Sequence, residues 1–151
     1  YTLLAEGMDR QTYVTAEYHH GVQNFVFSDG EFSRTIRQML VNENGKSLDL
    51  AAMMPRKWLE DGKRTSVEEA RTYFGVMSLQ IVSNTSKGII KSQIKPPSRV
   101  PVPMRLRLRH PQEKSIKSVT VNGKPFTNFD GEWINLPAGT KTLNIVARFA
   151  Q

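Results

Sequence analysis

Five aromatic and cationic side chains in this chain are suited to contact a carbohydrate. The flat ring of a tryptophan or tyrosine packs against the apolar face of a sugar, and Trp58, Tyr73 and Trp133 are the candidates for this contact. Guanidinium groups match the carboxylate or sulfate of an acidic sugar, which makes Arg105 and Arg107 candidates as well. The same residue types also fill cores and cover the solvent face of a strand, and for the arginines we favour this second interpretation.

Carboxylates that could cleave a glycosidic bond are a second group to test. Such cleavage needs two carboxyl groups about 5 to 10 Å apart, one of them with a raised pKa. The acidic candidates are Glu17, Asp29, Glu31, Asp49, Glu60 and Asp61. A helix N-terminus explains Asp29 and Glu31 better, because it favours negative charge, and Glu60 and Asp61 fall in a polar turn. We therefore predict no catalytic residue in this chain.

His19 and His20, with Glu17 nearby, suggest a metal site at first sight. Neighbouring residues of an extended segment point to opposite sides, however, and zinc needs three or four convergent ligands. The chain contains no cysteine, which excludes disulfides, thiolate ligands and a cysteine nucleophile. We expect neither a metal nor a cofactor.

The overall composition is that of a basic chain with a hydrophobic core. It has 151 residues, 38% of them hydrophobic, and a formal charge of +7. The lysines and arginines are spread along the sequence, so we do not expect a nucleic-acid partner. No apolar run approaches the roughly 18 residues that a membrane helix needs. Since the sequence begins at Tyr1 rather than Met, we expect a mature or truncated segment.

The elements that must position these side chains begin with an amphipathic helix. Ser28 and Glu31 have the spacing of a capping box, and Gly45 is a typical stop. Apolar residues at helical spacing follow the cap: Phe32, Ile36, Met39 and Leu40. One such helix needs a partner to bury its stripe, either the strands beyond it or a missing neighbour.

From Ser47 onward the apolar residues recur at every second position, as in strands with one buried face. Pro55 interrupts this pattern, and we expect Trp58 to be the apolar residue that a one-turn loop buries beneath it. Asn122-Gly123 predicts a hairpin, and the prolines of 96–103 predict a crossing between sheets. The predicted strands are 47–50, 75–83, 90–94, 104–109, 116–121, 133–136 and 143–149. The pattern indicates a mainly β fold, an antiparallel β-sandwich of roughly seven to nine strands, preceded by a short helical segment.

Four pieces of the sequence carry a resemblance to a known group of proteins: Arg34–Val41, Met54–Gly62, Tyr73–Gly75 and Ser118–Pro125. Together they resemble the C-terminal region of bacterial glycoside hydrolases, in which an (α/α) toroid ends and a β-sandwich follows. The likeness covers roughly residues 33–151. It implies a remnant of the toroid over 1–45 and a C-terminal sandwich over 46–151.

The resemblance also implies a role. The catalytic carboxylates of such enzymes lie mostly in the toroid, upstream of this region. The sandwich would then brace the catalytic toroid domain of the same parent chain, and the enzyme would be periplasmic or secreted. A loop with Glu17, His19 and His20 would lie near the mouth of the cleft.

Two other functions remain open from the sequence. The chain could be a free-standing carbohydrate-binding module that contacts an oligo- or polysaccharide through exposed aromatic rings. A weaker alternative is a polyanion or nucleic-acid binder that uses the positive charge. Burial of Trp58 and Trp133 would count against the first, and dispersed charge against the second.

Overall fold

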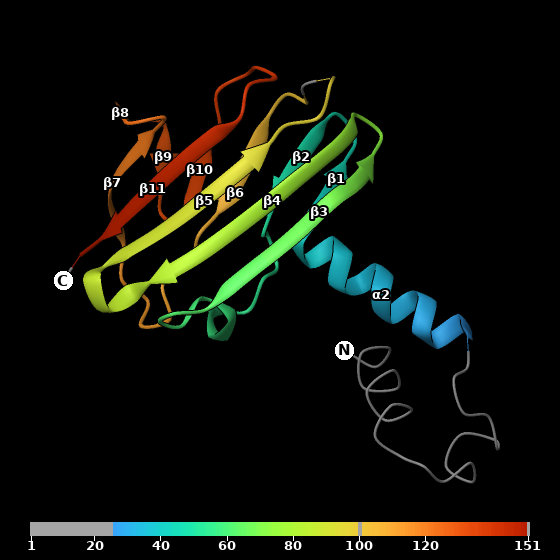
Figure 1. Cartoon of the computed structure of the whole chain (residues 1–151), viewed down its shortest axis with the longest axis horizontal. Coiled ribbons are helices and arrows are strands. Elements are labelled where there is room, and N and C mark those ends of the chain that lie inside the picture. Colours follow the sequence, from blue (N-terminus) through green and yellow to red (C-terminus); the bar gives the residue numbers. More distant parts are fainter. Residues whose placement is uncertain (1–25, 100, 151) are drawn as a thin grey trace, which may run out of the picture. The chain divides into compact units, whose positions relative to one another are not determined.

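The computed structural model describes residues 26–99 and 101–150, in which one helix precedes two β-sheets (Figure 1). The chain divides into two compact units, Tyr1–Met39 and Leu40–Gln151. The strands that the structure describes all belong to the second unit. Glu17, His19 and His20 lie outside the described residues, and the helical remnant over 1–45 stays a prediction.

Helix α2 (Val26–Leu40) has different ends from those that the sequence pattern predicts. It begins before Ser28, which therefore lies inside the helix rather than at its N-cap. It ends five residues before Gly45, because Val41–Asn44 forms strand β1. Pairing with β2 (Ser47–Leu50) gives the backbone of β1 antiparallel partners, and this outweighs a weak helical preference of the asparagines. Gly45, at φ +58°, lies in the hairpin turn instead.

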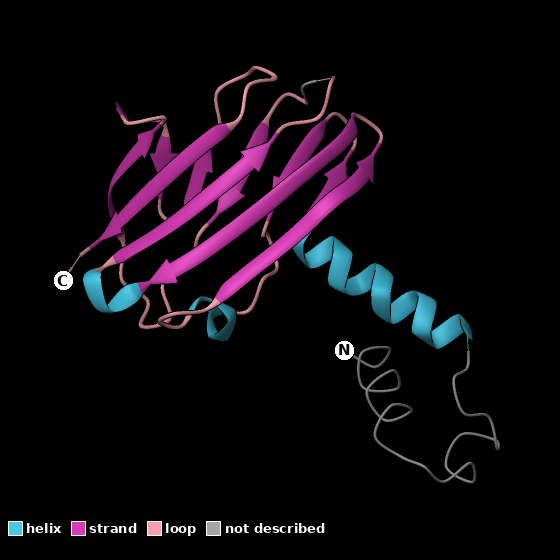
Figure 2. Ribbon diagram, viewed as in Figure 1, coloured by secondary structure: helices cyan, strands magenta, loops and turns pink. Residues whose placement is uncertain are grey.

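The predicted β-sandwich is confirmed for residues 40–99 and 101–150 (Figure 2). One sheet, sheet A, has the strand order β1-β2-β6-β10-β9, and the other, sheet B, has the order β3-β4-β5-β11-β7-β8. The remaining strands are β3 (Arg64–Thr72), β4 (Gly75–Asn84), β5 (Ile89–Lys95), β6 (Met104–Arg107), β7 (Ile116–Val121), β8 (Lys124–Phe126), β9 (Phe129–Asp130), β10 (Trp133–Asn135) and β11 (Leu143–Phe149). Short 3-10 helices follow β2 and β4: η2 (Arg56–Leu59) and η3 (Thr85–Lys87).

Strand pairing is antiparallel except between β2 and β6, which run parallel with Leu48 opposite Met104. The predicted crossing at the prolines produces this pair. Strand β5 lies in sheet B, and the segment 96–103 carries the chain to β6 in sheet A. The chain thus returns beside a strand that it left more than fifty residues earlier.

The core between the sheets follows the period of two. Met77, Leu79 and Ile81 of β4 are at most 2% exposed, and they meet buried residues of the opposite sheet such as Leu106 and Ile134. Full burial of one such side chain stabilises the fold by about 1.5–3 kcal/mol. Ser78 and Gln80, which lie between them, are polar and less buried, so this part of β4 has one apolar face in the core and one polar outer face.

Strand β3 was not among the predicted strands, because its sequence is almost entirely polar. It is one of the two edge strands of sheet B, the other being β8, and its charged residues disfavour pairing of this edge with another chain. Its register shifts between Val67 and Ala70, where Glu69 has φ +51°. Such a bulge bends an edge strand and further disfavours pairing.

Candidate functional site

The outer face of sheet A holds Arg105 and Arg107, the two arginines considered as candidates for sugar contact. Arg105 lies directly beside Asp49 on the neighbouring strand. Its Nε and Nη2 atoms each donate to one carboxylate oxygen of Asp49, at 2.8 Å. Asp49 is only 6% exposed, and its hydrogen bonds raise the pKa of the Arg105 guanidinium. This bidentate pair is a structural use of both residues.

Arg107 and Arg56 share a second acid, Glu132. Arg107 Nη2 lies 2.9 Å from Glu132 Oε2, and Arg56 donates to Glu132 Oε1. Arg107 also donates to the carbonyl of Ala52 at 3.0 Å. Arg109 likewise donates to the carbonyl of Met54, at 2.8 Å, so the arginine row fastens the segment after β2 to sheet A.

Trp133 lies among these arginines rather than in an open groove. Its ring is partly buried, and the guanidinium carbon of Arg105 is 4.7 Å from the ring centroid. The guanidinium carbon of Arg107 is 5.3 Å from the same centroid. A sugar that stacked on this ring would therefore have to displace cation–π contacts already made within the sandwich.

The other two aromatic candidates lie near opposite ends of β3. Trp58, in η2, packs partly against the core and lines a groove of about 640 Å³ beside Arg64, where β3 begins. Tyr73 follows the end of β3 and is 80% exposed. The structure thus does not bring the predicted aromatic residues together into one site. Of the three, Trp58 lies in a groove, and the cations of that groove are Lys57, Lys63 and Arg64.

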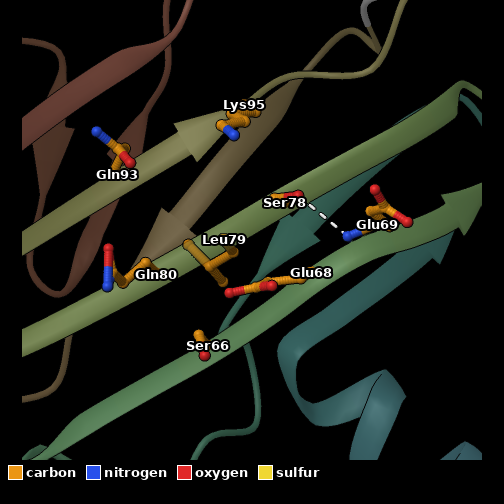
Figure 3. Close-up of a pocket in the computed structure, with 8 residues that line it drawn as sticks. All are labelled: Ser66, Glu68, Glu69, Ser78, Leu79, Gln80, Gln93 and Lys95. Carbon is orange, nitrogen blue, oxygen red and sulfur yellow. Dashed lines mark hydrogen bonds between the residues drawn. The ribbon is translucent and has the colours of Figure 1, made fainter.

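A polar depression on the outer face of sheet B was not predicted (Figure 3). It has a volume of about 220 Å³, and Ser66, Gln80 and Gln93 line it from three successive strands. In sequence these residues look like the ordinary wet face of strands. Only the strand register, which places them opposite one another, reveals a group.

Asp49, Glu132 and Asp61 do not have the environment that a catalytic acid needs. Asp49 and Glu132 are held in the ion pairs above. Asp61 accepts a hydrogen bond from the backbone N–H of Ser86 at 2.8 Å, which lowers its pKa, whereas a general acid needs a raised one. Within residues 26–99 and 101–150, no cluster of histidines and acids is suited to hold a metal.

His110 is a buried polar residue that the sequence did not single out. It is 2% exposed, and its ring centroid lies 5.1 Å from that of Phe149. Its Nδ1 accepts a hydrogen bond from the backbone N–H of Gln112 at 3.1 Å, which fixes the neutral ring with the proton on Nε2. Burial, together with the nearby Lys114 and Arg56, lowers the pKa of His110.

Comparison with known proteins gives no family for this chain: no family model and no curated protein matches its sequence. Helix α2, the one α-helix in the described part of the chain, is too short and too polar to cross a membrane.

Proposed function

We propose that this chain is the C-terminal, non-catalytic β-sandwich region of a bacterial carbohydrate-active enzyme, a glycoside hydrolase, and that it braces the catalytic helical toroid of the same parent chain. A periplasmic or secreted location belongs to the same proposal. Its first support is the order of elements at the junction. A helix, the short strands β1 and β2, Pro55 and a one-turn loop with Trp58 come before the main strands. The enzymes that the sequence resembles have a similar order, with one strand between the helix and the loop.

The observation that carries the bracing role is a continuous set of bonds from the end of the helix into sheet A. Helix α2 ends at Leu40, and β1 begins at the next residue, without a linker. The carbonyl of Leu40 accepts a hydrogen bond from the N–H of Ala51, at 2.8 Å. Arg107 and Arg109 hold the segment 52–54, which follows Ala51, against sheet A. The segment that joins the helix to the main strands is therefore bonded into the sandwich unit at both Leu40 and 52–54.

The charged side chains of sheet A support a non-catalytic role. Its acids neutralise arginines, and the arginines hold backbone carbonyls of the neighbouring loop. These side chains are committed to bonds within the sandwich, which supports a structural use for them.

Deletion of residues 41–151 from the parent enzyme tests the bracing role. We expect the melting temperature of the helical domain to fall by several degrees, because the sandwich no longer holds the end of α2. Hydrolysis of a small chromogenic glycoside should persist below the new melting temperature. An unchanged melting temperature would refute bracing. An Arg107→Met variant should reproduce part of the shift, while Arg148→Met, an exposed position on β11, serves as its control.

A further inference from the structure

The groove beside Trp58 combines an aromatic wall with positive charge. It has a volume of about 640 Å³, within the range of pockets that hold small ligands. Trp58 is partly buried: its ring packs against the core and also lines the groove. Lys57 and Lys63 line the same groove, and both are exposed. Since the lining residues that the structure describes include no acid, this composition favours an anion that also has an apolar face.

The three cations of the groove differ in how much of their bonding capacity is already used. The guanidinium of Arg64 faces the side-chain amide of Gln80, whose oxygen, in the orientation that satisfies both groups, accepts from Arg64 Nε at 2.9 Å. The ammonium groups of Lys57 and Lys63, by contrast, have no hydrogen-bond or ion-pair partner within residues 26–99 and 101–150. The two lysines therefore supply the positive charge that a ligand in this groove would meet.

Bonds to neighbouring elements hold both sides of the groove in place. Arg56 of η2 donates to the carbonyl of His110 at 2.7 Å, and Leu59 of the same helix is 1% exposed. On the side of β3, the carbonyl of Lys63 accepts a hydrogen bond from the N–H of Ser83 in β4, at 2.9 Å. The backbone on both sides of the groove is therefore fixed before a ligand arrives, which limits the entropy lost on binding.

We propose that this groove binds a uronate residue of an acidic oligosaccharide, with the sugar ring against Trp58 and its carboxylate between Lys57 and Lys63. A pyranose ring has an apolar face that packs on an aromatic side chain. Its hydroxyl groups both donate and accept, as do those of Thr65 and Ser66 on the β3 side of the groove. The choice of a sugar rests on the proposed function, whereas the choice of an anion rests on the two lysines.

Two other kinds of anion fit the groove less well. A nucleic-acid strand carries a charge at every phosphate and needs a longer stripe of cations, whereas Glu60 and Asp61 lie in the chain between Trp58 and Lys63. A glutamate-rich peptide carries suitable charge but has no flat apolar face for the ring of Trp58. A uronate presents one charge and one apolar face together, which matches what the groove offers.

Calorimetric titration of the full chain with trigalacturonate tests the proposal. We expect binding, and we expect the same trisaccharide with methyl-esterified carboxylates to bind at least about fivefold more weakly, because the ester keeps the sugar rings but removes the charge. Added salt should weaken binding of trigalacturonate and leave binding of the ester unchanged. No detectable binding of trigalacturonate, or equal binding of its ester, would overturn the proposal.

The two lysines allow a matched comparison, since both are exposed and their replacement leaves the core intact. The double variant Lys57→Met, Lys63→Met should bind trigalacturonate at least about fivefold more weakly and with less dependence on salt. The control Lys117→Met, Lys124→Met removes two exposed lysines from β7 and β8, at the other side of sheet B. This control should bind like the unaltered chain, and equal weakening by it would contradict the proposed site.

The aromatic wall is tested in the same way. Trp58→Met keeps an apolar side chain against the core but removes the ring, and it should weaken binding, while Tyr73→Met, at an 80% exposed tyrosine outside the groove, should not. An oligonucleotide or a polyglutamate that binds as tightly as trigalacturonate would show that the groove selects charge alone, and would overturn the proposal. None of these results changes the effect of deleting residues 41–151 on the melting temperature, so failure here is distinct from failure of the bracing role.

Discussion

The buried pair of Asp49 and Arg105 should respond asymmetrically to loss of one partner. Asp49 is almost completely buried, with 8% of its side chain exposed, whereas 36% of the Arg105 side chain is exposed. Replacement of Arg105 by Met keeps much of the aliphatic volume but leaves a buried carboxylate without its counterion. Loss of one partner of a buried pair costs about 3–5 kcal/mol, and we take the lower end because Arg105 is partly solvated.

Replacement of Asp49 by Ala leaves the opposite situation. The guanidinium of Arg105 keeps contact with water and with the ring of Trp133, at 4.7 Å, so its charge remains partly solvated. We expect a loss of about 1.5–2 kcal/mol, the lower part of the range for a hydrogen bond to a charged group. The double variant should resemble Asp49→Ala alone, because no unpaired carboxylate remains.

Urea unfolding of the two single variants and the double variant measures these free energies as a double-mutant cycle. The predicted order of stability is unaltered chain, then Asp49→Ala and the double variant together, then Arg105→Met. A larger loss for Asp49→Ala than for Arg105→Met would refute the idea that burial of the carboxylate, rather than the ion pair as such, sets the cost.

Two further predictions concern His110 and the turns. Because the pKa of His110 is lowered, the folded state resists protonation of this residue. The chain should therefore lose stability as pH falls below the unfolded value of about 6.5. The variant His110→Gln should lose less stability between pH 7.5 and 5.5, as measured by the midpoints of urea unfolding. Gly75 has φ +118°, and a Cβ there would lie 2.7 Å from Ser98 Oγ. Gly75→Ala should therefore cost about 1–3 kcal/mol, more than Gly45→Ala, where a Cβ meets nothing within 4 Å. Equal melting temperatures for the two glycine variants would contradict this reasoning.

The sequence pattern was sufficient to predict those strands that bury one face. The alternation of Met77, Leu79 and Ile81 and the turn at Asn122-Gly123 both have the predicted structure. Strand β3 was missed, because an edge strand buries little and its polar residues carry no apolar period. The parallel pairing of β2 with β6 was also missed, since short-range patterns hold no information on which distant strands meet.

For the candidate sites too, local sequence identified single residues but not the distant residues that they meet. Trp58 was a candidate from its residue type alone, and the structure places it in a groove. The arginines of β6 were correctly expected on a polar strand face, but their partners Asp49 and Glu132 lie on other elements. The polar row of Ser66, Gln80, Gln93 and Asn144 on the outer face of sheet B depends on the register of four strands, so no single stretch of sequence contains it. Gln93 and Asn144, which bond directly, are 51 positions apart.

The parallel pairing of β2 with β6 has a consequence for how the chain reaches its native state. Strands β3, β4 and β5 form successive hairpins, so their contacts are local and close with little loss of chain entropy. Leu48 and Met104, by contrast, pair across a loop that contains the whole meander and the proline segment, so their contact is long-range in sequence. We expect the three-stranded meander to form first and sheet A to be completed last, when β6 inserts between β2 and β10. Sheet A is thus expected to be the last part of the sandwich to assemble during folding.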